Sequence, residues 1–312
     1  MEIGYKENIR QEIYNEFLKF DVTIDTSKSF KETLLDYSNW RRRFIKKVPR
    51  EVCFSKEIKT NSNFMSYKKA ISKIEYKFKN GQDLTPFLSK LVVNTPLKAN
   101  SKSSSSDKDV FLNAFNIHHL HLNTEYQRKP TKGITFIKRS NYLLFVMIKQ
   151  DKVYFLDIEK HNFGNINLFR IIKNNWEHLI QPYKVKGFPP LSQNYRSDEE
   201  ISKLLKAGVS PSVQIDGSFY ALGLLTTSGH SMDWSRHLES ILQAIDSLYE
   251  ELLLNQHEIE QKLNISIPTY KISLNSGDFF VQEENSGFYI IRDRNNILNF
   301  IEEKRLFLSF NF

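Results

Sequence analysis

Two apolar runs separated by four polar residues constrain the fold of this chain more than any other feature. The runs are Tyr142–Ile148 and Val153–Ile158, and the residues between them, Lys149–Lys152, are polar. Runs of this length that are rich in β-branched and aromatic residues, and that are joined by a short polar turn, are typical of a β-hairpin. We therefore expect two antiparallel strands in the middle of the chain.

A third strand, Ile117–Leu122, precedes this hairpin and contains three histidines. Because side chains alternate across a strand, His119 and His121 share one face. His118 lies on the other face, together with leucines, and we expect it to pack in a core. A further histidine, His161, follows the last strand of the hairpin.

Helical patterns and one more strand come before these three strands. Glu51–Ser55 has the composition of a short strand. Apolar residues at helical spacing between Phe64 and Phe78 predict a helix that ends at Asn80 and Gly81. A second short helix is expected over residues 83–91, and the serine tract 101–106 is typical of a linker.

The two ends of the chain have patterns of their own. Residues 1–49 predict a helical cap whose second helix is capped by Ser29 or Ser27. Towards the C-terminus we expect a hairpin that turns at residues 216–217 and a long helix, Met232–Leu263, with a stripe of leucine and isoleucine. Strands are expected over residues 270–274, 279–282 and 288–292.

These elements predict an α+β protein with three domains. They are an N-terminal helical cap over residues 1–49, a central antiparallel-sheet domain over 50–182, and a C-terminal α+β domain over 183–312. The stripe of the long helix favours burial against a sheet or another helix, and it also offers a seam for a homodimer.

The composition limits the cell compartment and the chemistry. The only cysteine, Cys53, excludes an intrachain disulfide and a thiolate metal cluster, which indicates a reducing compartment. The N-terminus has no apolar signal core, and no run approaches the roughly 20 apolar residues that span a bilayer. We therefore expect a cytoplasmic protein that does not enter a membrane.

The formal net charge of +8 is concentrated in part between residues 41 and 59. Arg41, Arg42 and Arg43 begin this stretch, which contains only two acidic residues. A local excess of this kind is typical of proteins that bind a polyanion such as RNA. The other interpretation is a solvated basic face without a partner.

Several classes of active site are missing from the sequence. It contains no Gly-x-Ser-x-Gly elbow and neither of the glycine-rich phosphate loops. His119, His121 and His161 could ligate a metal, but no carboxylate lies at ligand spacing within the histidine cluster, so we predict neither a metal nor a cofactor. A metal enzyme with histidine ligands is kept only as a weaker alternative.

General acid–base chemistry on RNA fits these residues, because histidine titrates near neutral pH and RNA supplies its own 2′-hydroxyl nucleophile. In this hypothesis His119 or His121 is the base and His161 the acid. The basic residues around them would bind phosphate: Arg128, Lys138, Arg139 and Lys160, with Arg41, Arg42 and Arg43 as further RNA contacts.

The order of these elements, a strand, two helices and three antiparallel strands between residues 51 and 158, resembles the RelE/ParE toxin superfamily. Many members of that superfamily cut messenger RNA on the ribosome with basic and histidine side chains on an open sheet face. The resemblance implies that His161 occupies a functional position at the end of the last strand, with His119, Lys138 and Arg139 on the neighbouring strands. The helical cap and the C-terminal domain lie outside it.

The resemblance, taken with the histidines and basic residues, implies a bacterial, toxin-like effector, a metal-independent endoribonuclease that acts in growth arrest or phage defence. RNA, in a ribosome-associated form, would be its target, and an inhibitor protein would restrain it. Because a fold alone does not establish an enzyme, the alternative is a binding module without catalysis. That module would bind nucleic acid or protein in a defence or regulatory complex.

Overall fold

A computed structural model describes residues 2–22, 25–94, 109–160, 165–187, 196–207, 209–226, 230–275, 278–292, 298–301 and 308–309. The fold is α+β, as predicted. The chain divides into two compact units, one formed by residues 42–233 and the other by residues 1–41 together with 234–312. Three consecutive domains were predicted, whereas residues 1–41 group with residues 234–312 in one compact unit.

The unit formed by residues 42–233 is built on a four-stranded sheet in the order β1-β4-β3-β2. Its strands are β1 (Glu51–Phe54), β2 (Ile117–His121), β3 (Tyr142–Ile148) and β4 (Lys152–Lys160). The predicted hairpin is confirmed as the antiparallel pair β3-β4, and β2 pairs antiparallel with β3. Strand β1 pairs parallel with β4 at the opposite edge. The histidine strand is therefore an edge strand.

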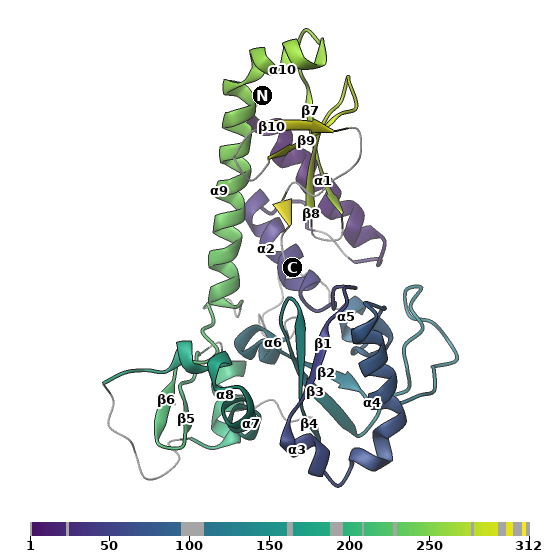
Figure 1. The fold of residues 1–312 in the computed structure, drawn as a ribbon, viewed down its shortest axis with the longest axis vertical. Helices are drawn as coiled ribbons and strands as arrows, with labels where there is room; N and C mark the ends of the chain where they lie inside the picture. Colours follow the sequence, from purple (N-terminus) through teal and green to yellow (C-terminus); the bar gives the residue numbers. More distant parts are fainter. Residues whose placement is uncertain are drawn as a thin grey trace. The chain divides into compact units, whose positions relative to one another are not determined.

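Helices cover both faces of this sheet (Figure 1). Helix α4 (Phe64–Lys79) packs on one face, where the rings of Phe78 and Phe155 are 5.8 Å apart. Helix α7 (Asn167–Trp176) packs on the other, where the rings of Trp176 and Tyr154 are 4.8 Å apart. The central strands are accordingly buried along almost their whole length, without the alternation of a one-sided sheet. The open sheet face implied by the resemblance is thus covered here.

The remaining elements of this unit are short. The predicted second helix is a 3₁₀ turn followed by a single helical turn, and the predicted hairpin at residues 216–217 is confirmed. Asp216 and Gly217 both have positive φ, 47° and 77°, as a two-residue hairpin turn of this type requires. The bounds are α3 (Lys56–Thr60), η1 (Thr85–Phe87), α5 (Leu91–Asn94), α6 (Val110–Phe115), η2 (Glu177–Leu179), η3 (Gln181–Tyr183), α8 (Asp198–Lys206), β5 (Val213–Ile215) and β6 (Ser218–Tyr220).

The second unit combines helices from both ends of the chain with a second sheet. Its helices are α1 (Glu2–Leu18), α2 (Phe30–Arg41), α9 (Met232–Leu254, of which the first two residues belong to the other unit) and α10 (Gln256–Leu263). Its strands are β7 (Tyr270–Asn275), β8 (Asp278–Glu283), β9 (Tyr289–Arg292), β10 (Leu298–Ile301) and β11 (Leu308–Ser309). Strand β8 pairs with β7, β9 and β11, and β9 pairs with β10.

The predicted long helix is two helices, because α9 ends at Leu254 and α10 begins at Gln256. The apolar stripe of α9 is buried within the chain. Ion pairs join α9 to the N-terminal helices, with Lys6 Nζ 3.2 Å from an oxygen of Asp246. The pattern that suggested a homodimer seam is therefore satisfied by packing inside one molecule.

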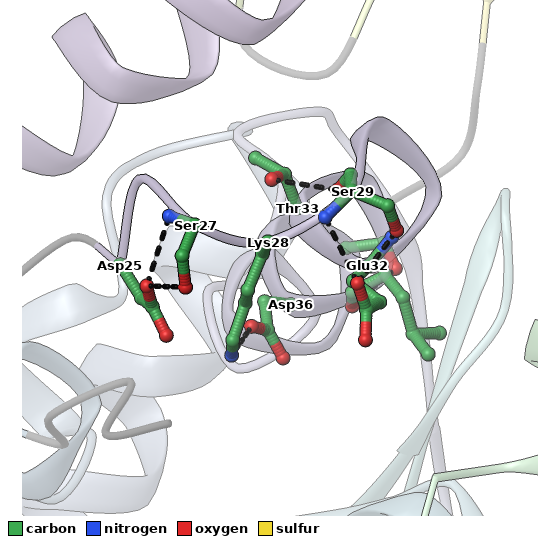
Figure 2. Close-up of polar contacts among 9 residues, drawn as sticks. Asp25, Ser27, Lys28, Ser29, Glu32, Thr33 and Asp36 are labelled. Carbon is green, nitrogen blue, oxygen red and sulfur yellow. Dashed lines mark hydrogen bonds and ion pairs between the residues drawn. The ribbon is translucent and has the colours of Figure 1, made fainter. Parts of the chain in front are cut away.

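Helix α2 begins at the predicted serine, Ser29 (Figure 2). The hydroxyl of Ser29 accepts a hydrogen bond from the Glu32 backbone N–H, and Glu32 Oε2 accepts one from the Ser29 backbone N–H. This reciprocal pair is a capping box, which satisfies backbone donors that the first turn leaves free. Ser27 instead donates to Asp25 in the preceding turn.

Candidate nucleic-acid interface

Helix α4 carries a strong positive charge on its exposed face. It contains five lysines and one acidic residue, Glu75, and Glu75 is neutralised by Lys79 at 2.7 Å. Lys68 and Lys69 are exposed, and Tyr76 on the same side of the helix has 59% of its surface exposed. Residues three, four or seven positions apart lie on one side of a helix. The solvent side of α4 is therefore basic and carries an aromatic ring.

The segment 123–139 adds a second basic element next to α4 (Figure 1). It contains five basic residues and one acidic residue. Backbone contacts fold it back on itself, because Tyr126 bridges to Ile137 and the N–H of Gln127 donates to the carbonyl of Phe136 at 2.8 Å. This segment is thus an ordered hairpin-like loop with exposed charges.

Lys73 of α4 connects the helix to this loop. Its Nζ lies 3.3 Å from Tyr126 Oη and 4.7 Å from the centroid of the Tyr126 ring. Tyr126 nevertheless keeps 43% of its surface exposed. The only acidic residue of the loop, Glu125, is paired with Lys138 at 2.5 Å. The loop therefore faces solvent with little negative charge of its own.

Two further aromatic contacts extend this region to the end of the sheet. The rings of Tyr67 on α4 and Tyr142 on β3 are 6.1 Å apart. Lys160, the last residue of β4, has its Nζ 5.9 Å from the centroid of Tyr142. Basic and aromatic side chains thus follow one another from the sheet, along α4, to the loop.

We call this region the α4 surface. It consists of aromatic and basic side chains from α4, the loop and the ends of β3 and β4: Tyr67, Lys68, Lys69, Lys73, Tyr76, Tyr126, Arg128, Lys129, Lys138, Arg139, Tyr142 and Lys160. No family model, curated protein or solved structure matches the chain.

Four of the predicted RNA contacts belong to the α4 surface. Arg128, Lys138, Arg139 and Lys160 are all exposed. Lys138 forms an ion pair with Glu125, and the ammonium group of Lys160 lies over the ring of Tyr142.

The three arginines at the end of α2 are less suited to that role. Arg43 is only 6% exposed, so its side chain has almost no surface for RNA. Arg42 contacts the side-chain oxygens of Asn113 and Asn116 at 3.4 and 3.5 Å. Burial lowers the pKa of Arg42 to about 10, which nearby carboxylates partly oppose. Arg41 is partly exposed.

Arg50, in the same basic stretch, also has a structural role. Its guanidinium donates to the backbone carbonyls of Lys46, Val48 and Lys149 at 2.8, 3.3 and 3.0 Å. The buried residues Arg43 and Arg50 thus account for part of the charge excess between residues 41 and 59.

The histidine strand is largely buried. His118 packs inside, as expected, and burial lowers its pKa to about 3. His119 is 9% exposed, and its ring centroid is 6.4 Å from that of Phe145. His121 is partly exposed, and its Nδ1 accepts from the backbone N–H of Ser140 at 3.5 Å. Of the two predicted base candidates, His121 is therefore the more accessible.

Strand pairing places His121 on the same sheet face as Glu159. Both residues flank Leu143, since His121 pairs with Leu143 and Leu143 pairs with Glu159. Burial raises the pKa of Glu159, and the carboxylates of Asp157 and Asp198 raise it further. A carboxyl group with a raised pKa can hold a proton nearer to neutral pH. His161, the predicted acid, lies outside the described residues.

Within the described part of the chain, His, Cys, Asp and Glu form no group of three or more with the geometry of a metal site. None of the helices in these described ranges combines the length and apolar character needed to cross a bilayer.

The exposed residues of α4 were not among the predicted RNA contacts. The helix was predicted from its apolar face alone. The signal was present, because Lys69, Lys73 and Tyr76 recur at spacings of four and three residues, on the side of the helix away from Ile71 and Ile74.

Proposed function

We propose that the unit formed by residues 42–233 binds nucleic acid through the α4 surface. The observation that carries this proposal is the joining of two basic elements by Lys73 and Tyr126. Each element has five basic residues and one acidic residue, and each acidic residue is paired with a lysine of its own element. Lysine and arginine side chains that neutralise phosphates release the counterions condensed on the nucleic acid, and this gives strong binding that depends on salt.

The test is the salt dependence of RNA binding by the whole chain. Fluorescence polarisation with a labelled oligouridylate gives the dissociation constant over a range of salt concentrations. Removing one phosphate contact lowers the slope of log affinity against log salt by about 1. We expect the double variant Lys68→Ala, Lys69→Ala to lose about 2 from that slope and to bind more weakly at every salt concentration.

The matched control removes two exposed lysines from elsewhere in the same unit. Lys59 on α3 and Lys203 on α8 are exposed and lie outside the α4 surface. The variant Lys59→Ala, Lys203→Ala has the same net charge as the test variant. Equal losses in both double variants would mean that net charge alone drives binding, and the α4 surface would then lose its assignment.

A second proposal is that the same unit cleaves RNA as a metal-independent endoribonuclease of a toxin-like effector. His121 and Glu159, on one sheet face, support it. In this reaction one residue takes the proton of the 2′-hydroxyl and the other protonates the leaving 5′-oxygen. Attack of the 2′-oxygen on phosphorus leaves a 2′,3′-cyclic phosphate and a free 5′-hydroxyl.

Expression in bacteria with mapping of RNA ends tests this second proposal. We expect growth arrest and new 5′-hydroxyl ends with the wild-type chain, and neither with His121→Ala or Glu159→Gln. Cleavage by the purified protein should persist in a chelator. If both variants still arrest growth and produce the same ends, these residues do not catalyse cleavage. If the wild-type chain binds RNA and never cuts it, the non-catalytic binding module is favoured.

A further inference from the structure

Two tyrosines of the α4 surface expose their rings although large aromatic side chains normally bury most of their area. Tyr76 is 59% exposed and Tyr126 is 43% exposed. They come from separate elements, α4 and the loop 123–139, and Lys73 of α4 contacts Tyr126. Phosphate binding alone would not require an exposed ring on either element.

The ring of Tyr126 is held in place before any ligand arrives. Lys73 lies over the ring at 4.7 Å and contacts its hydroxyl at 3.3 Å. The neighbouring Gln127 is fixed by backbone and side-chain bonds to Phe136 and Ile137, at 2.8 and 3.0 Å. A ring that is already ordered loses little conformational entropy when a flat ligand stacks on it.

Basic residues lie on both elements that carry these rings, and the one carboxylate of each element, Glu75 or Glu125, is paired with a lysine. Lys68 and Lys69 lie on α4, and Arg128 and Lys129 are exposed on the loop. A base can therefore stack on a tyrosine while the phosphates on either side of it meet lysine or arginine. This combination of a stacking ring and a basic path is how proteins hold single-stranded nucleic acid without reading its sequence.

We propose that the α4 surface selects single-stranded nucleic acid, with bases stacked on Tyr126 and Tyr76. A duplex offers the same phosphates but keeps its base faces inside the stack. An acidic protein offers charge but no flat bases. The inference rests on the proposed nucleic-acid binding and adds the class of ligand.

The test compares four probes of equal length on the full chain at one salt concentration. They are an oligouridylate, the corresponding oligodeoxyuridylate, an RNA duplex, and an oligomer in which every nucleotide is abasic. We expect the abasic oligomer and the duplex to bind about tenfold more weakly than the single strands, or weaker still, since each stacked base contributes roughly this factor. The ribose and deoxyribose strands show whether the 2′-hydroxyl adds affinity.

Variants identify the rings that stack. Tyr126→Ala and Tyr76→Ala should each reduce the preference for the natural strand over the abasic strand, whereas Tyr126→Phe should keep it. Met65→Ala, at another exposed position of α4, is the control and should leave the preference unchanged. Lys69→Ala should weaken natural and abasic strands by the same factor.

The results of these experiments distinguish base stacking from nucleic-acid binding as such. Equal affinity for natural, abasic and duplex probes would overturn the stacking inference and leave nucleic-acid binding intact. Binding of polyglutamate as tightly as the oligonucleotides would identify an acidic protein surface as the partner instead. Failure to bind any nucleic-acid probe would overturn both the stacking inference and the proposed nucleic-acid binding. Tyr76 is a second site for the test, so a folding defect in Tyr126→Ala would not decide the result.

Discussion

The ammonium group of Lys73 lies 4.7 Å from the ring centroid of Tyr126 and 3.3 Å from its hydroxyl oxygen. This contact fastens the loop 123–139 to α4. Cation–π pairs at partly exposed sites contribute about 0.5–1 kcal/mol. We expect a coupling of this size between Lys73→Ala and Tyr126→Ala in a double-mutant cycle measured by urea unfolding. Lys68→Ala with Tyr126→Ala is the control cycle and should be additive.

Replacement of Gly81 should destabilise the fold more than replacement of an unhindered glycine. Gly81 has φ of +60°, and a Cβ built on it would lie 2.8 Å from Pro49 Cδ and 2.9 Å from the carbonyl carbon of Val48. Gly133 has φ of +77° and no atom within 4 Å of its built Cβ. Backbone strain alone costs about 1–2 kcal/mol. We therefore expect Gly81→Ala to lower the free energy of unfolding clearly more than Gly133→Ala.

Removal of the hydroxyl of Tyr220 should stabilise the protein or leave it unchanged. The side chain is fully buried, and its hydroxyl has no hydrogen-bond partner among the described residues. A buried polar group without a partner costs about 1–3 kcal/mol. Tyr220→Phe keeps the ring and removes this cost, so the midpoint of urea unfolding should rise or stay the same. A clear fall would show that the hydroxyl has a partner, for example an ordered water.

The central sheet could be predicted from the sequence because its strands are continuous apolar runs. Tyr142–Ile148 and Val153–Ile158 are correct to within two residues as β3 and β4. Continuous apolar runs are also typical of strands that are buried on both faces, but the sequence-based prediction did not include this burial. The resemblance to toxins with an open sheet face led us to expect His119 on an exposed face. In the structure His119 is buried.

The location of the exposed charge was harder to predict, because a run of basic residues does not show which of them face solvent. Arg43 and Arg50 are buried, although they stand in the most basic stretch of the sequence. The lysines of α4 are spread along the helix and do not form a continuous basic run in the sequence. Only the packing of α4 on the sheet and its contact with Tyr126 bring them together with the loop. Contacts between segments that are distant in the sequence, such as α1 and β7, could not be predicted either.

The stability of the protein at acid pH should depend on His118. This side chain is 8% exposed, and burial is the largest cause that lowers its pKa from 6.5 to about 3. Asp109 opposes the shift, whereas Arg42, His119 and Arg50 add to it. The ring is therefore neutral in the folded protein at pH 5, while the unfolded chain is protonated there.

Between pH 6.5 and 3 the unfolded chain binds more protons at this residue than the folded chain, so stability must fall as the pH falls. The loss contributed by one such group is about 1 kcal/mol per pH unit. Buried Asp157 and partly buried Glu159 have raised pKa values and act in the opposite direction, because in the folded state they take up protons first. Urea unfolding of His118→Gln between pH 7 and 4 separates the two effects. The variant should have a flatter dependence of unfolding free energy on pH than the wild type, and an unchanged slope would mean that His118 is not the buried group that titrates.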